Sequence, residues 1–183
     1  MNQDLRNITS RLGTLTASSG QQSTPLNFAV GAVFALLKAE SLGYTSQDEV
    51  GRGLRIWEQA KQLCQQIAGE GEAALPTKGD WLAGYFFNDG IIRIAVAFEH
   101  LVRQETNLYG HERFGQMRNK ALAEGFCKEW MDSWCSVNEE LIRIRHRNTE
   151  YVDGPLVTYE RAVASLGHLA EALHWAINRH PIN

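Results

Sequence analysis

The densest cluster of functional side chains lies between residues 143 and 153 and consists of Arg143, Arg145, His146, Arg147, Asn148, Glu150 and Asp153. Arginine forms bidentate contacts with phosphate, asparagine hydrogen-bonds sugars and phosphates, and histidine exchanges a proton near neutral pH. Together these residue types predict a phosphate-contacting site. The alternative interpretation is a solvated helix end, because cations complement the negative pole of a helix dipole.

The elements that must position this cluster are predicted to be helices. A helix from about Asp80 to Glu105 carries an apolar stripe at steps of four and three: Phe87, Ile91, Ile94, Phe98 and Leu101. A neighbouring stripe adds Trp81, Tyr85, Ile92, Ala95 and Val102. Because this helix is apolar over more than half its circumference, we expect it to be central. Its notable polar members are Asn88, Asp89, Arg93 and Glu99.

Other helices are expected before and after this one along the sequence. Two lie between Leu26 and Ala68, the second beginning with a capping box at Ser46, and a short helix follows Gly110. The next helix places six apolar residues on one side: Cys127, Trp130, Trp134, Val137, Leu141 and Ile144. The last begins after Pro155 and has the most regular stripe: Tyr159, Val163, Leu166, Ala170, Leu173 and Ile177.

The predicted fold is therefore an all-α, up-and-down helical bundle of about five to seven helices, since strand signals are essentially absent. Residues 1–24 are expected to form an N-terminal helix and a flexible link, and residues 25–183 a single helical-bundle domain. A chain of 183 residues has the length of one such domain and can bury a core without a metal or disulfide.

Composition restricts the classes of function. The net charge of -3 and pI near 6.1 exclude a globally basic nucleic-acid protein, so any phosphate site must be local. Three cysteines, Cys64, Cys127 and Cys135, lack a C-x-x-C spacing and indicate a reducing compartment. The N-terminus has no apolar signal region and no stretch is long enough to span a membrane. We expect a cytoplasmic protein without a metal, a cofactor or a membrane partner.

Two segments resemble the HEPN superfamily, which comprises all-α domains of prokaryotic defence and toxin systems. One is Tyr85-Phe-Phe-Asn88-Asp-Gly-Ile-Ile-Arg93, continuing to Glu99 on the central helix. The other is the helix end Leu141-Ile-Arg-Ile-Arg-His-Arg147-Asn148, followed by a turn and a long final helix. The resemblance covers residues 80–179. It implies a homodimer or a subunit of a larger complex, and many members are metal-independent ribonucleases.

The family signature is an arginine, often followed by asparagine, with a histidine after four to six further residues. Arg147 and Asn148 match its first half, but the later positions hold Val152, Asp153 and Gly154. Asp153, with an ordinary pKa of about 3.9, is a poor acid at neutral pH. His146 is adjacent to Arg147, and neighbours on a helix point about 100° apart.

The resemblance thus implies contact with RNA or nucleotide phosphate through Arg147 and Asn148. The nearby Arg143 and Arg145 are expected to join them, with Asn88 and Arg93 as supporting positions on the central helix. His146 and Asp153 are the remaining candidates for proton transfer. We expect binding without cleavage by this chain alone, and any enzyme activity to be that of a metal-independent ribonuclease.

Two other functions are weighed against this one. Glu171-Ala-Leu-His174 is one half of a carboxylate-bridged metal motif, to which Glu99 and Glu139 or Glu140 could add ligands. Such a site requires a second Glu-x-x-His, which the sequence lacks. A non-catalytic scaffold or dimerisation module is the other alternative. It is favoured by five tryptophans, including Trp130 and Trp134 one helical turn apart.

Overall fold

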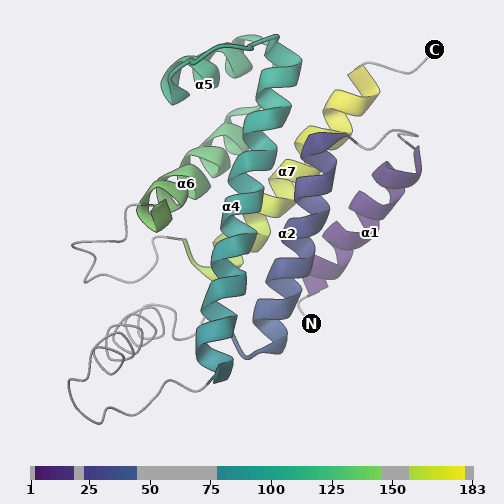
Figure 1. Ribbon diagram of the computed structural model, residues 1–183. Helices are drawn as coiled ribbons and strands as arrows, with labels where there is room; N and C mark the ends of the chain where they lie inside the picture. The colour runs from purple at the N-terminus through teal and green to yellow at the C-terminus, as the bar shows by residue number, and fades with distance from the viewer. Residues whose placement is uncertain (1–2, 19–22, 45–77, 146–156, 180–183) are drawn as a thin grey trace.

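The computed structural model describes residues 3–18, 23–44, 78–145 and 157–179, with side chains except those of residues 18, 78–82 and 145. Six helices and no strand are found in these ranges: α1 (Gln3–Ser18), α2 (Thr24–Ser41), α4 (Lys78–Thr106), α5 (Phe114–Ala123), α6 (Lys128–Arg145) and α7 (Tyr159–Arg179). Figure 1 shows the long helices running alternately up and down. The predicted all-α bundle is confirmed. The helix predicted to begin at Ser46 lies outside the described residues.

Helix α4 is central, as predicted, and packs against α2, α6 and α7. All five residues of its predicted stripe, from Phe87 to Leu101, are at most 2% exposed. Trp134 of α6 lies within 6.5 Å of Phe98, measured between ring centroids, and within 4.5 Å of Phe114. The core is therefore continuous from α4 into α5 and α6.

Two glycines let α2 and α4 approach closely. A Cβ on Gly90 would lie 2.8 Å from Cδ2 of the buried Leu36. A Cβ on Gly31 would lie 2.8 Å from Nη1 of Arg93. Since carbon atoms in ordinary contact are about 3.5–4.0 Å apart, neither position has room for a side chain without movement. Gly90 is the stricter of the two, because the buried Leu36 has little room to move, whereas the Arg93 side chain over Gly31 is long and flexible.

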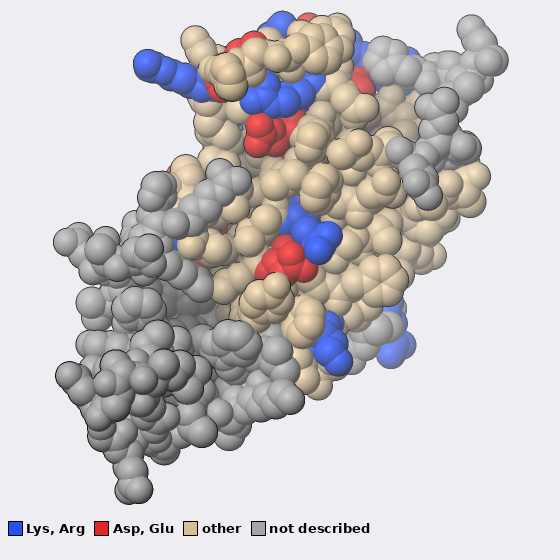
Figure 2. All heavy atoms as spheres, viewed as in Figure 1, with Lys and Arg blue, Asp and Glu red and all other residues tan. Residues whose placement is uncertain are grey.

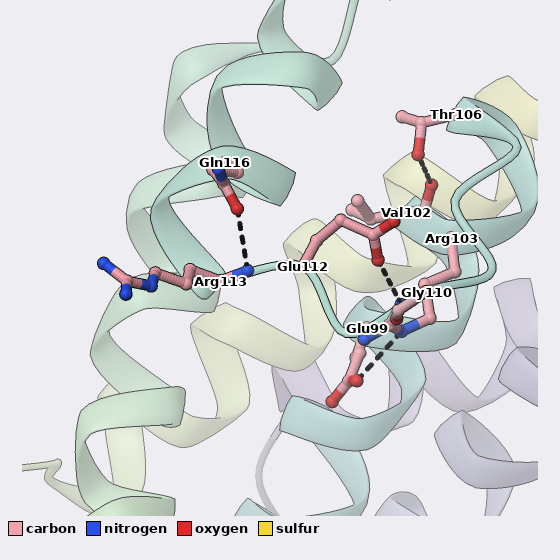
Figure 3. Close-up of polar contacts among 8 residues, drawn as sticks. All are labelled: Glu99, Val102, Arg103, Thr106, Gly110, Glu112, Arg113 and Gln116. Carbon is pink, nitrogen blue, oxygen red and sulfur yellow. Dashed lines mark hydrogen bonds and ion pairs between the residues drawn. The ribbon is translucent and has the colours of Figure 1, made fainter.

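The turn between α4 and α5 is held by Arg103, as Figure 3 shows. Its Nε donates to Glu99 at 3.0 Å, and its Nη1 donates to the Gly110 carbonyl at 2.9 Å and to Glu112 at 3.1 Å. The hydrogen bond to Glu99 raises the pKa of Arg103. One guanidinium thus ties the last turns of α4 to the chain that leads into α5.

Helix α7 begins at Tyr159, later than the start expected beside Pro155. The Thr158 hydroxyl accepts from the Arg161 amide at 3.2 Å, so Thr158 is the N-cap of α7. The sequence had not indicated a capping residue for this helix. The buried Tyr159 hydroxyl donates to the Leu36 carbonyl at 3.4 Å and to Glu40 at 3.3 Å. This side chain fastens the start of α7 to α2.

One predicted placement of an aromatic residue, that of Tyr85, is wrong. Tyr85, expected on a core-facing stripe, is 59% exposed, because α2, α6 and α7 cover other faces of α4 and its phenol packs edge-on against Phe86 instead. Trp134, predicted on the apolar side of its helix, is 1% exposed and belongs to the core. Trp81 of the same stripe lies outside the described side chains, whereas Ala95 and Val102 are buried as expected.

None of the six described helices has both the length and the apolar character needed to cross a lipid bilayer.

Candidate functional site

The four residues predicted to carry chemistry, His146, Arg147, Asn148 and Asp153, lie outside the described residues. Their neighbour Arg145 is the last residue of α6, and its side chain is likewise outside the description. The structure therefore gives the backbone position from which the basic segment departs, at the end of α6. Arg143, Asn88 and Arg93 are described in full.

Arg143 is largely withdrawn from solvent. Its Nη1 lies 3.6 Å from Oε2 of Glu140 one turn earlier on α6, and the two side chains are 12% and 1% exposed. A buried carboxylate needs a paired cation, since an isolated buried charge is costly. Arg143 therefore has a structural partner, which leaves little of its guanidinium for an external phosphate.

The two candidate residues on α4, Asn88 and Arg93, lie among side chains of the bundle itself. Arg93 donates from Nε to Asp89 at 2.8 Å and covers Gly31 of α2. Asn88 is half-buried on the same helix. Figure 2 shows the molecule from the same side as Figure 1. The middle of that face is mostly uncharged, and its basic and acidic atoms lie side by side instead of forming a patch of one sign. The described contacts do not join Arg93 and Arg143 into one site.

The described functional side chains gather instead along the groove between the antiparallel helices α6 and α7. Three pairs face each other across it at successive turns. Phe126, just before α6, packs on Trp175 at 4.9 Å between centroids. One turn along, Trp130 Nε1 donates to Glu171 Oε2 at 3.3 Å, and next Ser133 Oγ lies 2.6 Å from His168 Nδ1.

The Ser133 and His168 pair has the residue types of a nucleophile and its base. Acyl transfer also requires donors that stabilise an oxyanion beside the nucleophile. Ser133 lies within α6, where backbone amides are bonded to the preceding turn. The pair is therefore better explained as a polar link between two helices.

Where α6 begins and α7 ends, helix α1 borders this groove, and the three helices line an open hollow of about 660 Å³. Figure 1 shows α7 between α6 and α1, the helices that supply its lining. The lining combines two indoles, two guanidinium groups and three further polar side chains: Trp130, Trp175, Arg11, Arg179, Glu171, His174 and Asn178. We refer to it below as the α1/α6/α7 hollow.

The charged groups around the hollow contact one another and the indoles. Arg11 Nη1 lies 3.4 Å from Glu171 Oε1, and the two side chains are 51% and 47% exposed. The Arg179 guanidinium lies 5.0 Å from the Trp175 ring centroid, a cation–π contact. It also donates to Glu124, to the carbonyl at 2.8 Å and to the carboxylate at 3.4 Å. Two guanidinium groups, each paired with a carboxylate, and indole surface thus lie around one opening.

This hollow contains the Glu171 and His174 pair that the sequence offered as half of a metal motif. Glu171 is bonded to Arg11 and Trp130, and His174 Nε2 lies 2.9 Å from the Asn178 amide nitrogen. In the described residues no three His, Cys, Asp or Glu side chains cluster as metal ligands would. The donor set of the carboxylate-bridged alternative is therefore not assembled by these residues.

The two described cysteines are half-buried thiols without a disulfide partner in the described residues. Burial raises the pKa of both Cys127 and Cys135. A thiol with a raised pKa is a weak nucleophile at neutral pH, so neither is a candidate for covalent catalysis.

No protein-family model, curated protein or solved structure matches this chain.

Proposed function

We propose that this chain is an RNA- or nucleotide-phosphate-contacting helical domain that acts by binding rather than by cutting. The observation that carries the proposal is the α1/α6/α7 hollow, where indole surface lies beside the guanidinium groups of Arg11 and Arg179. Proteins hold single-stranded RNA with the same two elements: aromatic rings stack on bases, and cations pair with phosphates. The hollow supports local contact despite the net charge of -3.

The basic segment from Arg145 to Asn148 is a second contact region in this proposal, since Arg143 is paired with Glu140. It begins about 22 Å along the axis of α6 from Trp130, because fifteen residues at a rise of about 1.5 Å each separate the backbones of Trp130 and Arg145. The resemblance to the HEPN superfamily supports this region, and it also suggests a prokaryotic defence or RNA-processing assembly as the setting. The missing signature histidine favours binding over cleavage.

The test is an RNA-binding and cleavage assay in excess chelator. We expect labelled single-stranded RNA to bind in fluorescence anisotropy at low salt and to remain intact on a denaturing gel. Arg11→Ala should weaken binding several-fold and reduce the salt dependence by about one counterion. Arg6→Ala is the matched control, because Arg6 is exposed on α1 but does not line the hollow.

Arg147→Ala tests the second contact region in the same assay, and it should weaken binding in the same way. Cleavage that persists in chelator and disappears in Arg147→Ala would identify a ribonuclease and refute the binding-only function. RNA that does not bind the wild-type chain at low salt would refute the proposal as a whole.

A scaffold role is the second candidate, favoured by an apolar groove of about 410 Å³ between α1 and α2. Leu12, Val33 and Phe34 line it, and Phe34 is 69% exposed. If this groove joins two copies, sedimentation equilibrium should give a dimer for the wild type and a monomer for Phe34→Asp. A wild type that is monomeric at high concentration would remove this candidate.

A further inference from the structure

Glu171 is the acceptor group of the α1/α6/α7 hollow. Its two oxygens accept from Arg11 at 3.4 Å and from Trp130 at 3.3 Å, one bond to each oxygen. Charge-assisted hydrogen bonds are normally about 2.7–2.9 Å long, so both are weak. A carboxylate has about four acceptor positions. With a side chain 47% exposed, Glu171 retains acceptor capacity on both oxygens toward the hollow.

The surroundings of Glu171 add a stacking surface and positive charge. The Trp130 and Trp175 centroids are 6.0 Å apart with their planes at 60°, so the two indoles form a corner rather than a closed stack. Arg179 lies over the Trp175 ring at 5.0 Å from its centroid, so the indole surface left for a base is the part of the corner that this guanidinium does not cover. Arg11 lies on α1, across the hollow from α6, and its side chain is half-exposed.

The ligand that fits these groups has a flat ring, two adjacent N–H donors and a negative charge. Among the standard bases, guanine alone presents two neighbouring donors, N1–H and the N2 amino group, on its Watson–Crick edge. Adenine and cytosine place an acceptor beside their amino group, and uracil flanks its single N–H with two carbonyls. A carboxylate with two acceptor oxygens therefore selects guanine.

We propose that the α1/α6/α7 hollow binds a guanine nucleotide, free or within an RNA strand. The base stacks on indole surface, Glu171 accepts from N1–H and the N2 amino group, and the phosphate pairs with Arg11 or Arg179. This inference rests on the proposed function and names its base preference. It requires no catalytic step, because every contact is a hydrogen bond, an ion pair or a stacking contact.

The test compares four nucleoside monophosphates by isothermal titration calorimetry on the purified chain. We expect GMP to bind roughly tenfold more tightly than AMP, CMP or UMP, the discrimination typical of one bidentate base contact. Glu171→Gln should remove this preference, because glutamine offers one acceptor and one donor where guanine needs two acceptors. Glu160→Gln is the control, since Glu160 is exposed on α7 and does not line the hollow.

A parallel anisotropy experiment uses uridine-rich RNAs of equal length with and without a central guanosine. Tighter binding of the guanosine-containing RNA, lost in Glu171→Gln but kept in Glu160→Gln, supports the inference. Equal binding of both RNAs, unchanged by Glu171→Gln, would overturn the guanine preference while the proposed function stands. Absence of binding by every RNA and nucleotide would overturn both. Unfolding curves verify that each variant is folded.

Discussion

Replacing Gly90 by alanine tests the close packing of α2 and α4 that fixes the bundle. The added methyl group would lie 2.8 Å from Cδ2 and 3.0 Å from Cγ of Leu36, which is fully buried. Overpacking of this kind costs about 1–3 kcal/mol. Alanine also gains about 1 kcal/mol over glycine in a helix interior. The expected result is a net loss of about 1 kcal/mol in the free energy of unfolding.

Gly13→Ala is the matched control, because no atom lies within 4 Å of a Cβ built on Gly13 of α1. This variant receives the helix gain without the clash, so it should be more stable than wild type by about 0.5–1 kcal/mol. The helix term is common to both variants. The difference between them, about 1–3 kcal/mol, therefore isolates the packing term at Gly90.

Urea unfolding followed by circular dichroism at 222 nm measures both variants, provided that their m-values agree. In a Leu36→Ala background the methyl group no longer meets Cδ2, so the penalty of Gly90→Ala should largely disappear. The reasoning would be refuted if Gly90→Ala stabilised the protein as much as Gly13→Ala. It would also be refuted if the penalty were unchanged in the Leu36→Ala background.

Three further predictions concern the polar contacts of the fold. Arg103→Ala should lower the free energy of unfolding by about 1 kcal/mol in urea titration, because the α4–α5 turn loses the partly exposed hydrogen bonds of this guanidinium. The control is Lys120→Ala, which removes an exposed side chain and should change the free energy of unfolding little. Hydrogen bonds from Lys128 and Arg118 hold the pKa of Asp132 below its ordinary value. This carboxylate therefore stabilises the fold above its unfolded pKa, and the effect is lost as pH falls through the folded pKa. Asp132→Asn should therefore lose less stability than wild type between pH 6 and pH 3. Tyr159→Phe should cost about 1 kcal/mol in thermal unfolding, since the buried hydroxyl bonds two groups of α2; an unchanged midpoint would contradict those bonds.

The helices were predictable from sequence because their apolar residues repeat at helical spacing. The stripe that begins at Phe87 is buried in the structure as expected, and so is the stripe that begins at Tyr159 except for its last residue, the half-buried Ile177. Exposure around the rest of α4 was less predictable, as Tyr85 shows. The reason is that periodicity identifies an apolar face, whereas the neighbours that cover it depend on the order in which the other helices pack.

The candidate site was only partly predictable. The sequence singled out Glu171 and His174 because they are close in the chain and match half of a metal motif. The partners that define Glu171 in the structure, Arg11 and Trp130, are 160 and 41 residues away. No local spacing encodes such contacts. One available signal was the placement of Trp130 on the apolar side of α6, facing whichever helix lies beside it.

The most direct test of the proposed function is an NMR titration of the tryptophan indole N–H signals with GMP. We predict that the Trp130 signal, assigned by its loss in Trp130→Phe, shifts on titration together with that of Trp175. The buried Trp134 should shift less than either. If GMP left the Trp130 and Trp175 signals unchanged at millimolar concentration, the hollow would not be a nucleotide site and its part in the proposed function would be wrong.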